Sequence, residues 1–314
     1  MAFERVVKRT LPDGSVHKVY PFHISLEGME SVLICRDDED YDHLQKSYYL
    51  SAWKHNCLIA SEISMSNHGH FALLSTKMEV ARLVGETVKK RHSQYLSWKY
   101  NEKGILSHSS INVQYLDTDW YVRNALAYIH RNTLDAGSRV EDYKWSSYRA
   151  MFVGGKCSRT AMPVSAFSRR EREAIFHTHE DLSKVPWLLD IDLHIEPASA
   201  CDYTFLEEAF SHDQAFFLKT LGSVNMAEME QKLVVNGREK QTDMSMQSII
   251  NNLADKWFGS DISRLTPEQK ARLIPYLFRS YKTSESQLAR CMGMGRELVA
   301  SLLNASVVRR RSER

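Results

Sequence analysis

The sequence lacks several features that would assign it to a structural class at once. Its five cysteines are widely spaced and never paired as Cys-x-x-Cys, which argues against a disulfide scaffold and a zinc knuckle and predicts reduced, mostly buried thiols. No run approaches the roughly 18 consecutive apolar residues of a membrane helix. The first residues also lack the apolar region of a signal peptide. We therefore expect a cytoplasmic protein without a membrane partner.

A strong excess of charge is also missing. The formal net charge is only +2, which is too small to predict a polyanionic partner by itself. The position of the basic residues says more, because they cluster in the run Lys89-Lys90-Arg91 and again in Arg309-Arg310-Arg311. Either run can be a solvated surface, or it can bind the phosphates of DNA.

The spacing of apolar residues predicts an α+β first half and a helical last third. A length of 314 residues favours two or three folding units. We expect a first domain at residues 1–155, a mixed connecting region of unassigned role at 156–230, and a helical domain at 231–314. Strands are expected at residues 18–26, 31–35, 56–65, 68–75 and 111–115, and helices at 40–54, 79–100, 119–132 and 167–177. Thr266-Pro267-Glu268-Gln269 has the pattern of a helix start.

A histidine pair, His68 and His70, opens one of the expected strands. Side chains two apart on a strand point to the same face, so both imidazoles can bind one metal ion. Ala72 and Leu73 stand where a metallo-β-lactamase would need an acid and a third histidine, and no strand-helix repeats of an amidohydrolase barrel follow. Two incidental histidines remain the alternative.

A tyrosine and an asparagine share one face of the helix expected at residues 119–132. Tyr128 and Asn132 lie four apart, so a hydroxyl and an amide oxygen project together. Beside two imidazoles, the amide oxygen can complete a three-ligand site for Mg²⁺ or Mn²⁺ with positions open to phosphate oxygens. The alternative is a core tyrosine followed by a helix-end asparagine. Other tyrosines compete as nucleophiles: Tyr95, Tyr100, Tyr115 and Tyr121.

The order of these segments is itself informative. Met65 to Leu74 is followed by a basic helix ending at Tyr100, then by Ala127 to Gly137, and then by Asp142 to Tyr148. This order resembles the REP-associated tyrosine transposases, which are single-tyrosine HUH transposases. The resemblance covers residues 15–152, and His23 and the segment Asp38-Glu39-Asp40-Tyr41 are similar to that family's N-terminal pattern.

The resemblance implies a ferredoxin-like antiparallel sheet with helices, the HUH nuclease fold, acting as a homodimer on single-stranded DNA near hairpins. It assigns the metal ligands to His68, His70 and Asn132 and the nucleophile to Tyr128. The implied activity is that of a DNA endonuclease and strand transferase with a 5′-phosphotyrosine intermediate. Such a protein would be associated with the nucleoid.

The sequence departs from this family at three positions or segments. Gly69 replaces a bulky apolar residue and is expected to weaken the packing beneath the metal site. Residues 106–111 replace an aromatic-Gln segment, and Thr133 replaces a proline. These differences support an alternative function, that of a domesticated DNA-binding protein or regulator with weak or lost cleavage.

The segment from Glu285 to Leu303 has the spacing of a helix-turn-helix. Ala289 falls at the contact between the helices, Gly293 in the turn and Val299 in the shared core, which leaves Arg296 exposed at the start of the second helix. With the basic run that follows, this pattern predicts duplex-DNA binding. An ordinary helical hairpin is the alternative.

Overall fold

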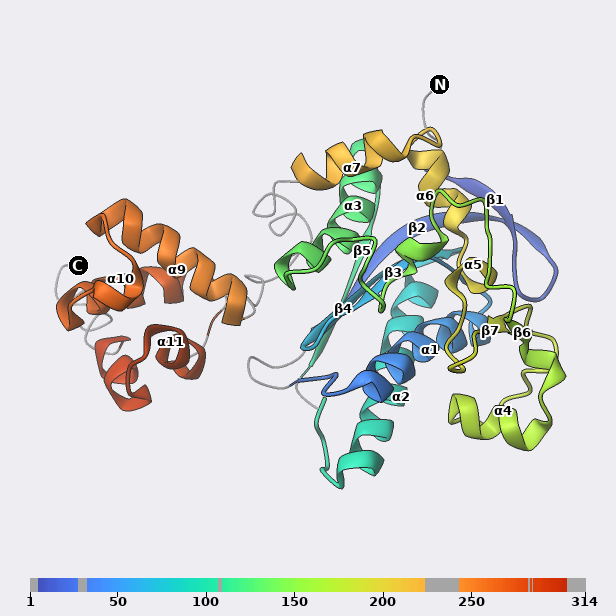
Figure 1. The fold of residues 1–314 in the computed structure, drawn as a ribbon, viewed down its shortest axis with the longest axis horizontal. Helices are drawn as coiled ribbons and strands as arrows, with labels where there is room; N and C mark the ends of the chain where they lie inside the picture. Colours follow the sequence, from blue (N-terminus) through green and yellow to red (C-terminus); the bar gives the residue numbers. More distant parts are fainter. Residues whose placement is uncertain are drawn as a thin grey trace. The chain divides into compact units, whose positions relative to one another are not determined.

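The computed structural model describes residues 5–27, 33–106, 109–223, 243–281, 283 and 285–303. The chain divides into two compact units, Met1–Met229 and Glu230–Arg314. The first unit contains an antiparallel sheet flanked by helices, whereas the described part of the second is helical (Figure 1). The α+β prediction is confirmed.

An antiparallel sheet forms the centre of the first unit. The strands and the helices between them are, in chain order, β1 (Val7–Thr10), β2 (Val16–Glu27), α1 (Asp38–Lys54), β3 (Leu58–Ser64), β4 (His68–Ser75), α2 (Met78–Tyr100) and β5 (Ser110–Tyr115). The main strands lie in the order β5–β2–β4–β3, and β1 pairs with the first part of β2. From β2 to β5 the chain therefore runs β-α-β-β-α-β.

The two faces of this sheet are covered by different helices. Helices α1 and α2 lie on one face, and α3 (Asp119–Asp135) lies on the other (Figure 1). On β4, Phe71 packs against Tyr48 of α1, while its neighbour His70 contacts Tyr128 of α3. Because side chains alternate along a strand, His68 and His70 both point to the face of the sheet that α3 covers.

Helix α3 begins where its sequence predicts and ends at Asp135, three residues after the predicted end. The Thr118 side chain caps its first turn by accepting from the Tyr121 amide. After the helix, Gly137 adopts φ +72°, a conformation that a side chain disfavours. These two ends fix the length of the helix that carries Tyr128 and Asn132.

The predicted strand at residues 31–35 is wrong for residues 33–35, the part of it that the structure describes. The amides of Ile34 and Cys35 both donate to the Ser66 carbonyl, and the Ile34 carbonyl accepts from His92. Their hydrogen bonds go to a turn and a side chain, so no strand forms. A short apolar run does not show which partners its backbone will find.

Residues 156–223, whose role the sequence left open, belong to the first unit, and Cys201 and Asp202 cover part of the edge of β3. Their elements are β6 (Met162–Pro163), α4 (Arg169–Phe176), β7 (Leu188–Leu189), α5 (Pro197–Ala200), α6 (Tyr203–Ala209) and α7 (Gln214–Ser223). Cys201 forms a parallel bridge with Ile59, and the Asp202 amide donates to the Ile59 carbonyl at 2.7 Å. Such cover protects an edge strand from pairing with other chains.

The second unit packs its helices around one apolar core. The elements are α9 (Asp243–Phe258), α10 (Pro267–Ser280), α11 (Glu285–Met292) and a helix at residues 296–303. Thr266 and Gln269 form the predicted capping box at the start of α10. Ala289 and Val299 are buried in this core, and Gly293, between the last two helices, adopts φ +63°. None of the helices in the described ranges is long and apolar enough to cross a membrane.

Candidate active site

The two predicted metal-binding histidines lie together on the sheet face that α3 covers. The ring centroids of His68 and His70 are 4.9 Å apart. The His70 ring also meets the edge of the Tyr128 ring at 5.3 Å. Alternation along β4 and the packing of α3 therefore bring the imidazole pair and the predicted nucleophile into one cluster.

Asn132 completes this cluster from the same helix as Tyr128. Its amide oxygen lies 3.1 Å from His68 Nε2. Its amide nitrogen donates to the carbonyls of Tyr128 and Ile129 at 2.9 and 3.2 Å. These two bonds fix the orientation of the amide and direct its oxygen at His68.

The donor atoms of this cluster fit a divalent ion. Neighbouring ligands of an octahedral ion lie about 3 Å apart when each is about 2.1 Å from the metal, which matches the 3.1 Å between His68 Nε2 and the Asn132 oxygen. The Nδ1 atom of His70 is buried and has no hydrogen-bond partner. The described residues contain no group of three or more His, Cys, Asp or Glu side chains placed to hold a metal. A metal here would therefore need the Asn132 oxygen, which suits Mg²⁺ or Mn²⁺ better than zinc.

Both imidazoles are held in the neutral form that binds metals. Burial lowers the pKa of His70 well below its usual value, and repulsion from His68 and His23 lowers it further. Burial also lowers the pKa of His68, although the contact with Asn132 opposes this change. Neutral rings can offer a lone pair to a metal ion at neutral pH.

A third histidine, His23 of β2, belongs to the cluster although the sequence did not assign it a role there. Its ring stacks on His70 at 5.1 Å and meets the Tyr128 ring at 6.1 Å. It is buried, its Nε2 has no hydrogen-bond partner, and burial lowers its pKa to about 3. The alternation of His23 and Ser25 inside an apolar strand is the signal that could have indicated a polar patch on one buried face.

His130, another buried histidine, links α3 to the sheet by hydrogen bonds. His130 Nε2 lies 2.8 Å from the Ser61 hydroxyl on β3, and its Nδ1 lies 3.0 Å from the Ser146 hydroxyl. Both contacts are fully buried. Since His130 lies between Tyr128 and Asn132 in the chain, these bonds hold the helix that positions the predicted nucleophile and ligand.

Gly69 does not leave the gap that its sequence predicts. A Cβ atom at this position would overlap the hydroxyl oxygen of Tyr48 and lie 3.3 Å from Tyr48 Cζ. The Tyr48 side chain, which is fully buried, occupies the space that a larger residue would take. The expectation of weak packing beneath the histidine pair is therefore wrong.

The other candidate tyrosines are engaged elsewhere in the first unit. Tyr95 stacks on His43 at 3.8 Å, and the Tyr100 hydroxyl donates to Asp40 at 2.7 Å. Tyr115 packs against Phe22 at 5.6 Å, and Tyr121 is buried. Among the five candidates, Tyr128 is the one that lies against His70.

Most of this cluster is buried, although His68 is partly exposed. The exposed fractions of His70, Tyr128 and Asn132 are 2%, 3% and 4%. Tyr128 therefore presents little surface to solvent in this structure.

The predicted DNA-binding residues of the first unit lie away from this cluster. Lys89, Lys90 and Arg91 lie on α2, on the opposite face of the sheet from Tyr128. Lys90 is exposed, whereas Lys89 donates to the Ser109 carbonyl at 2.7 Å, and burial lowers the pKa of Arg91. Arg296, in the second unit, has a 71% exposed side chain that lies 3.9 Å from Glu285. Arg309, Arg310 and Arg311 lie outside the described residues.

Comparison with known proteins gives one distant similarity. No protein-family model matches the sequence, and no curated protein matches it. A solved structure of a REP-associated tyrosine transposase bound to a REP hairpin matches with 12% sequence identity and a TM-score of 0.34. The match covers 44% of this chain and 82% of that chain. A TM-score of this size does not establish a common fold.

Proposed function

We propose that the chain is a transposase-like, metal-dependent endonuclease and strand transferase for single-stranded DNA. The observation that carries this proposal is the convergence of His68, His70 and Asn132 beside the ring of Tyr128. Two neutral imidazoles and an oriented amide oxygen suit Mg²⁺ or Mn²⁺, and a phenol next to them suits attack on a phosphate.

The topology of the first unit supports the same proposal. The β-α-β-β-α-β order from β2 to β5, with the strands arranged β5–β2–β4–β3, supports a ferredoxin-like fold. This arrangement puts β4, the strand that carries the histidine pair, between β2 and β3, and both histidines contact residues of α3. A rigid central strand and a packed helix can hold ligands and nucleophile in a fixed relation.

The reaction that follows is a transesterification. A divalent ion in the cluster would offset the negative charge that builds up on the phosphate. The Tyr128 oxygen bonds to phosphorus while the bond from phosphorus to the 3′ oxygen breaks, and the phenol proton is released as the 3′ oxygen gains one. The products are a 3′ hydroxyl and a 5′-phosphotyrosine. Because the new ester resembles the old one in energy, attack by another 3′ hydroxyl rejoins a strand without ATP.

An adduct assay tests this proposal. The full chain is incubated with Mn²⁺ and hairpin-bearing single-stranded oligonucleotides and then separated under denaturing conditions. We expect a covalent protein–DNA adduct with the unmodified chain and none with Tyr128→Phe, because phenylalanine has no oxygen to attack phosphorus.

Tyr121→Phe is the matched control, since it removes a hydroxyl from a buried tyrosine of the same helix. It should keep the adduct. An adduct that persists in Tyr128→Phe would refute the assignment of the nucleophile, and Mn²⁺ binding that survives the loss of both His68 and His70 would refute the metal site.

The burial of Tyr128 favours a second candidate function, that of a DNA-binding regulator with the same fold but without cleavage. In this case the second unit, with the exposed Arg296 at the start of its last described helix, would supply the DNA contact. Absent metal binding together with intact DNA binding would decide for this function.

Arg296→Ala tests the DNA contact of the second unit. If the arginine meets a phosphate, the substitution should weaken binding to duplexes of any sequence and reduce the slope of log affinity against log salt concentration by about 1. Fluorescence anisotropy at several salt concentrations measures both quantities. Leu298→Ala, which truncates an exposed side chain on the same helix, is the control. An unchanged slope in Arg296→Ala would exclude a phosphate contact at this position.

A further inference from the structure

We propose that Asn67 is a positioning residue that directs the Nε2 lone pair of His68 into the metal site, and that a polar network between α1 and α2 holds the turn carrying Asn67. This inference rests on the proposed function, because it explains how the proposed metal site keeps the Nε2 lone pair of His68 free to bind the ion. The sequence assigns no role to Asn67.

The contacts of His68 show why a positioning residue is needed. Its Nδ1 lies 2.8 Å from the Asn67 amide oxygen, and its Nε2 lies 3.1 Å from the Asn132 amide oxygen. Both neighbours are acceptors, whereas a neutral imidazole has one N–H group. The proton can therefore satisfy only one of the two contacts.

The two tautomers have opposite consequences for the metal site. With the proton on Nδ1, His68 donates to Asn67, and the Nε2 lone pair and the Asn132 oxygen face the same space as two ligands. With the proton on Nε2, His68 donates to Asn132, and the hydrogen bond occupies both ligand atoms. Histidine ligands commonly have their other ring nitrogen bonded to a fixed acceptor for this reason. Asn67 favours the open form without any change in charge.

The turn that carries Asn67 is itself held from outside the site. The carbonyl of the preceding residue, Ser66, accepts from the amides of Ile34 and Cys35 at 2.8 and 3.0 Å. On the other side of Asn67, the His68 carbonyl accepts from the Met65 amide at 2.8 Å. The position of the Asn67 side chain thus depends on where segment 34–36 lies.

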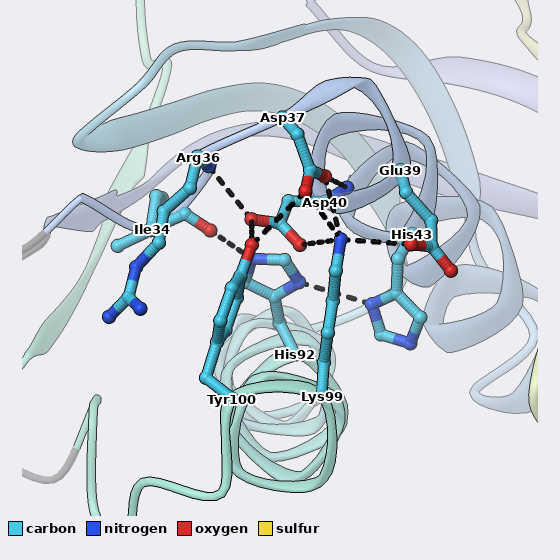
Figure 2. A network of polar contacts seen from close by, with 9 residues as sticks. All are labelled: Ile34, Arg36, Asp37, Glu39, Asp40, His43, His92, Lys99 and Tyr100. Atoms are coloured by element: carbon cyan, nitrogen blue, oxygen red, sulfur yellow. Dashed lines mark hydrogen bonds and ion pairs between the residues drawn. The ribbon is translucent and has the colours of Figure 1, made fainter.

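Segment 34–36 is fixed by the polar network shown in Figure 2. His92 of α2 donates to the Ile34 carbonyl at 2.6 Å, and the Arg36 amide donates to the Asp40 carboxylate at 2.8 Å. Asp40, fully buried at the start of α1, also accepts from Lys99 at 2.9 Å and from the Tyr100 hydroxyl at 2.7 Å. The network therefore joins the start of α1 to the end of α2 with segment 34–36 between them.

Calorimetric titration with Mn²⁺ tests the role of Asn67. Asn67→Ala should weaken Mn²⁺ binding about 10- to 100-fold, the usual effect of losing an acceptor that orients a metal ligand. Asn67→Asp keeps an acceptor oxygen and should bind Mn²⁺ at least as tightly as the unmodified chain. Asn124→Ala, which removes an amide bonded to a backbone carbonyl on α3, should leave Mn²⁺ affinity unchanged. Equal affinities for Asn67→Ala and the unmodified chain would overturn the proposal.

A second readout keeps the inference separate from the proposed function. Nitrogen-15 spectra of the metal-free chain, with His68 assigned by its substitution, report which ring nitrogen carries the proton. Asn67→Ala should shift His68 toward the Nε2–H form, and Asn67→Asp should not. If the unmodified chain binds no Mn²⁺, the proposed function fails. The shift in Asn67→Ala still decides whether Asn67 determines the tautomer of the His68 ring. An unchanged tautomer in Asn67→Ala would overturn the inference.

The contribution of the network is tested by Lys99→Met, which removes the cation that three carboxylates share, those of Asp37, Glu39 and Asp40. Hydrogen exchange at the amides of Ile34 and Cys35 should become faster, and Mn²⁺ affinity should fall by less than in Asn67→Ala. If exchange at these amides and Mn²⁺ affinity both stay unchanged, the network does not hold the turn.

Discussion

Gly69→Ala is expected to destabilise the first unit by about 2–3 kcal/mol, the usual cost of forcing extra atoms into a packed core. For a unit of this size that cost corresponds to a fall in Tm of about 4–12 °C. The added Cβ would overlap the hydroxyl oxygen of Tyr48, whose ring is fully buried and packs against Phe71 at 4.9 Å. The Tyr48 hydroxyl also donates to the Ile63 carbonyl at 3.5 Å, and moving the ring away from the added Cβ would break this contact. Urea unfolding of the full chain measures the change.

A double-mutant cycle with Tyr48→Phe identifies the cause. Tyr48→Phe alone should cost about 1 kcal/mol for the lost hydrogen bond. It also removes the atom that the new Cβ overlaps, so Gly69→Ala should cost little more in the Tyr48→Phe background, with a coupling of about 1–2 kcal/mol. Gly222→Ala, on α7 with no atom near its added Cβ, is the control and should not lower stability. Additive costs at the two positions would show that Tyr48 does not exclude a side chain at position 69.

The spacing of residues in the sequence predicts only part of this site. Spacing alone places His68 and His70 on one face of a strand and Tyr128 and Asn132 on one face of a helix, because the repeats of strands and helices are fixed. Spacing does not say that these two faces meet. The expectation that the two faces meet came from the resemblance to a family. In the structure, the packing of α3 on β4 brings His68 into contact with Asn132.

The features that the sequence did not predict depend on contacts between distant segments. Tyr48 reaches the space beside Gly69 from another element, and the backbone of residues 33–35 finds partners in a turn and a histidine. His23 joins the cluster only because β2 pairs with β4. In contrast, the capping box of α10 is a local pattern, and it was predicted correctly. Local patterns such as helix caps can be predicted from the sequence, whereas contacts between distant segments cannot.

Glu62 is expected to make the stability of the first unit fall as the pH rises. This β3 residue is fully buried, and its carboxyl group accepts from the Gln45 amide at 2.8 Å. Its other oxygen, Oε2, has no hydrogen-bond partner. Burial raises the pKa of Glu62 from 4.5 to about 8, although Gln45, Arg149 and Tyr49 oppose this change. Glu62 is therefore protonated in the folded protein at neutral pH.

The direction of the effect follows from the two pKa values. Between 4.5 and about 8 the folded chain holds a proton on Glu62 that the unfolded chain has released, so stability decreases as the pH rises through this window. At about 1.4 kcal/mol per pKa unit, the loss between pH 6 and pH 9 is on the order of 2–3 kcal/mol. Glu62→Gln keeps the size of the side chain and cannot ionise. Its free energy of unfolding should lack this decrease, and at pH 9 it should exceed that of the unmodified chain.

Urea unfolding at pH 6 and pH 9 measures the difference, with Glu180→Gln as the control. Glu180 pairs with Lys54 at 2.7 Å on the surface, so removing its charge should leave the decrease between the two pH values in place. A Glu62→Gln chain that loses as much stability as the unmodified chain would mean that Glu62 is already ionised when folded. A carboxylate with an unpaired oxygen would then be buried beside Gln45 and Tyr49, at a cost that the neighbouring hydrogen bonds do not offset.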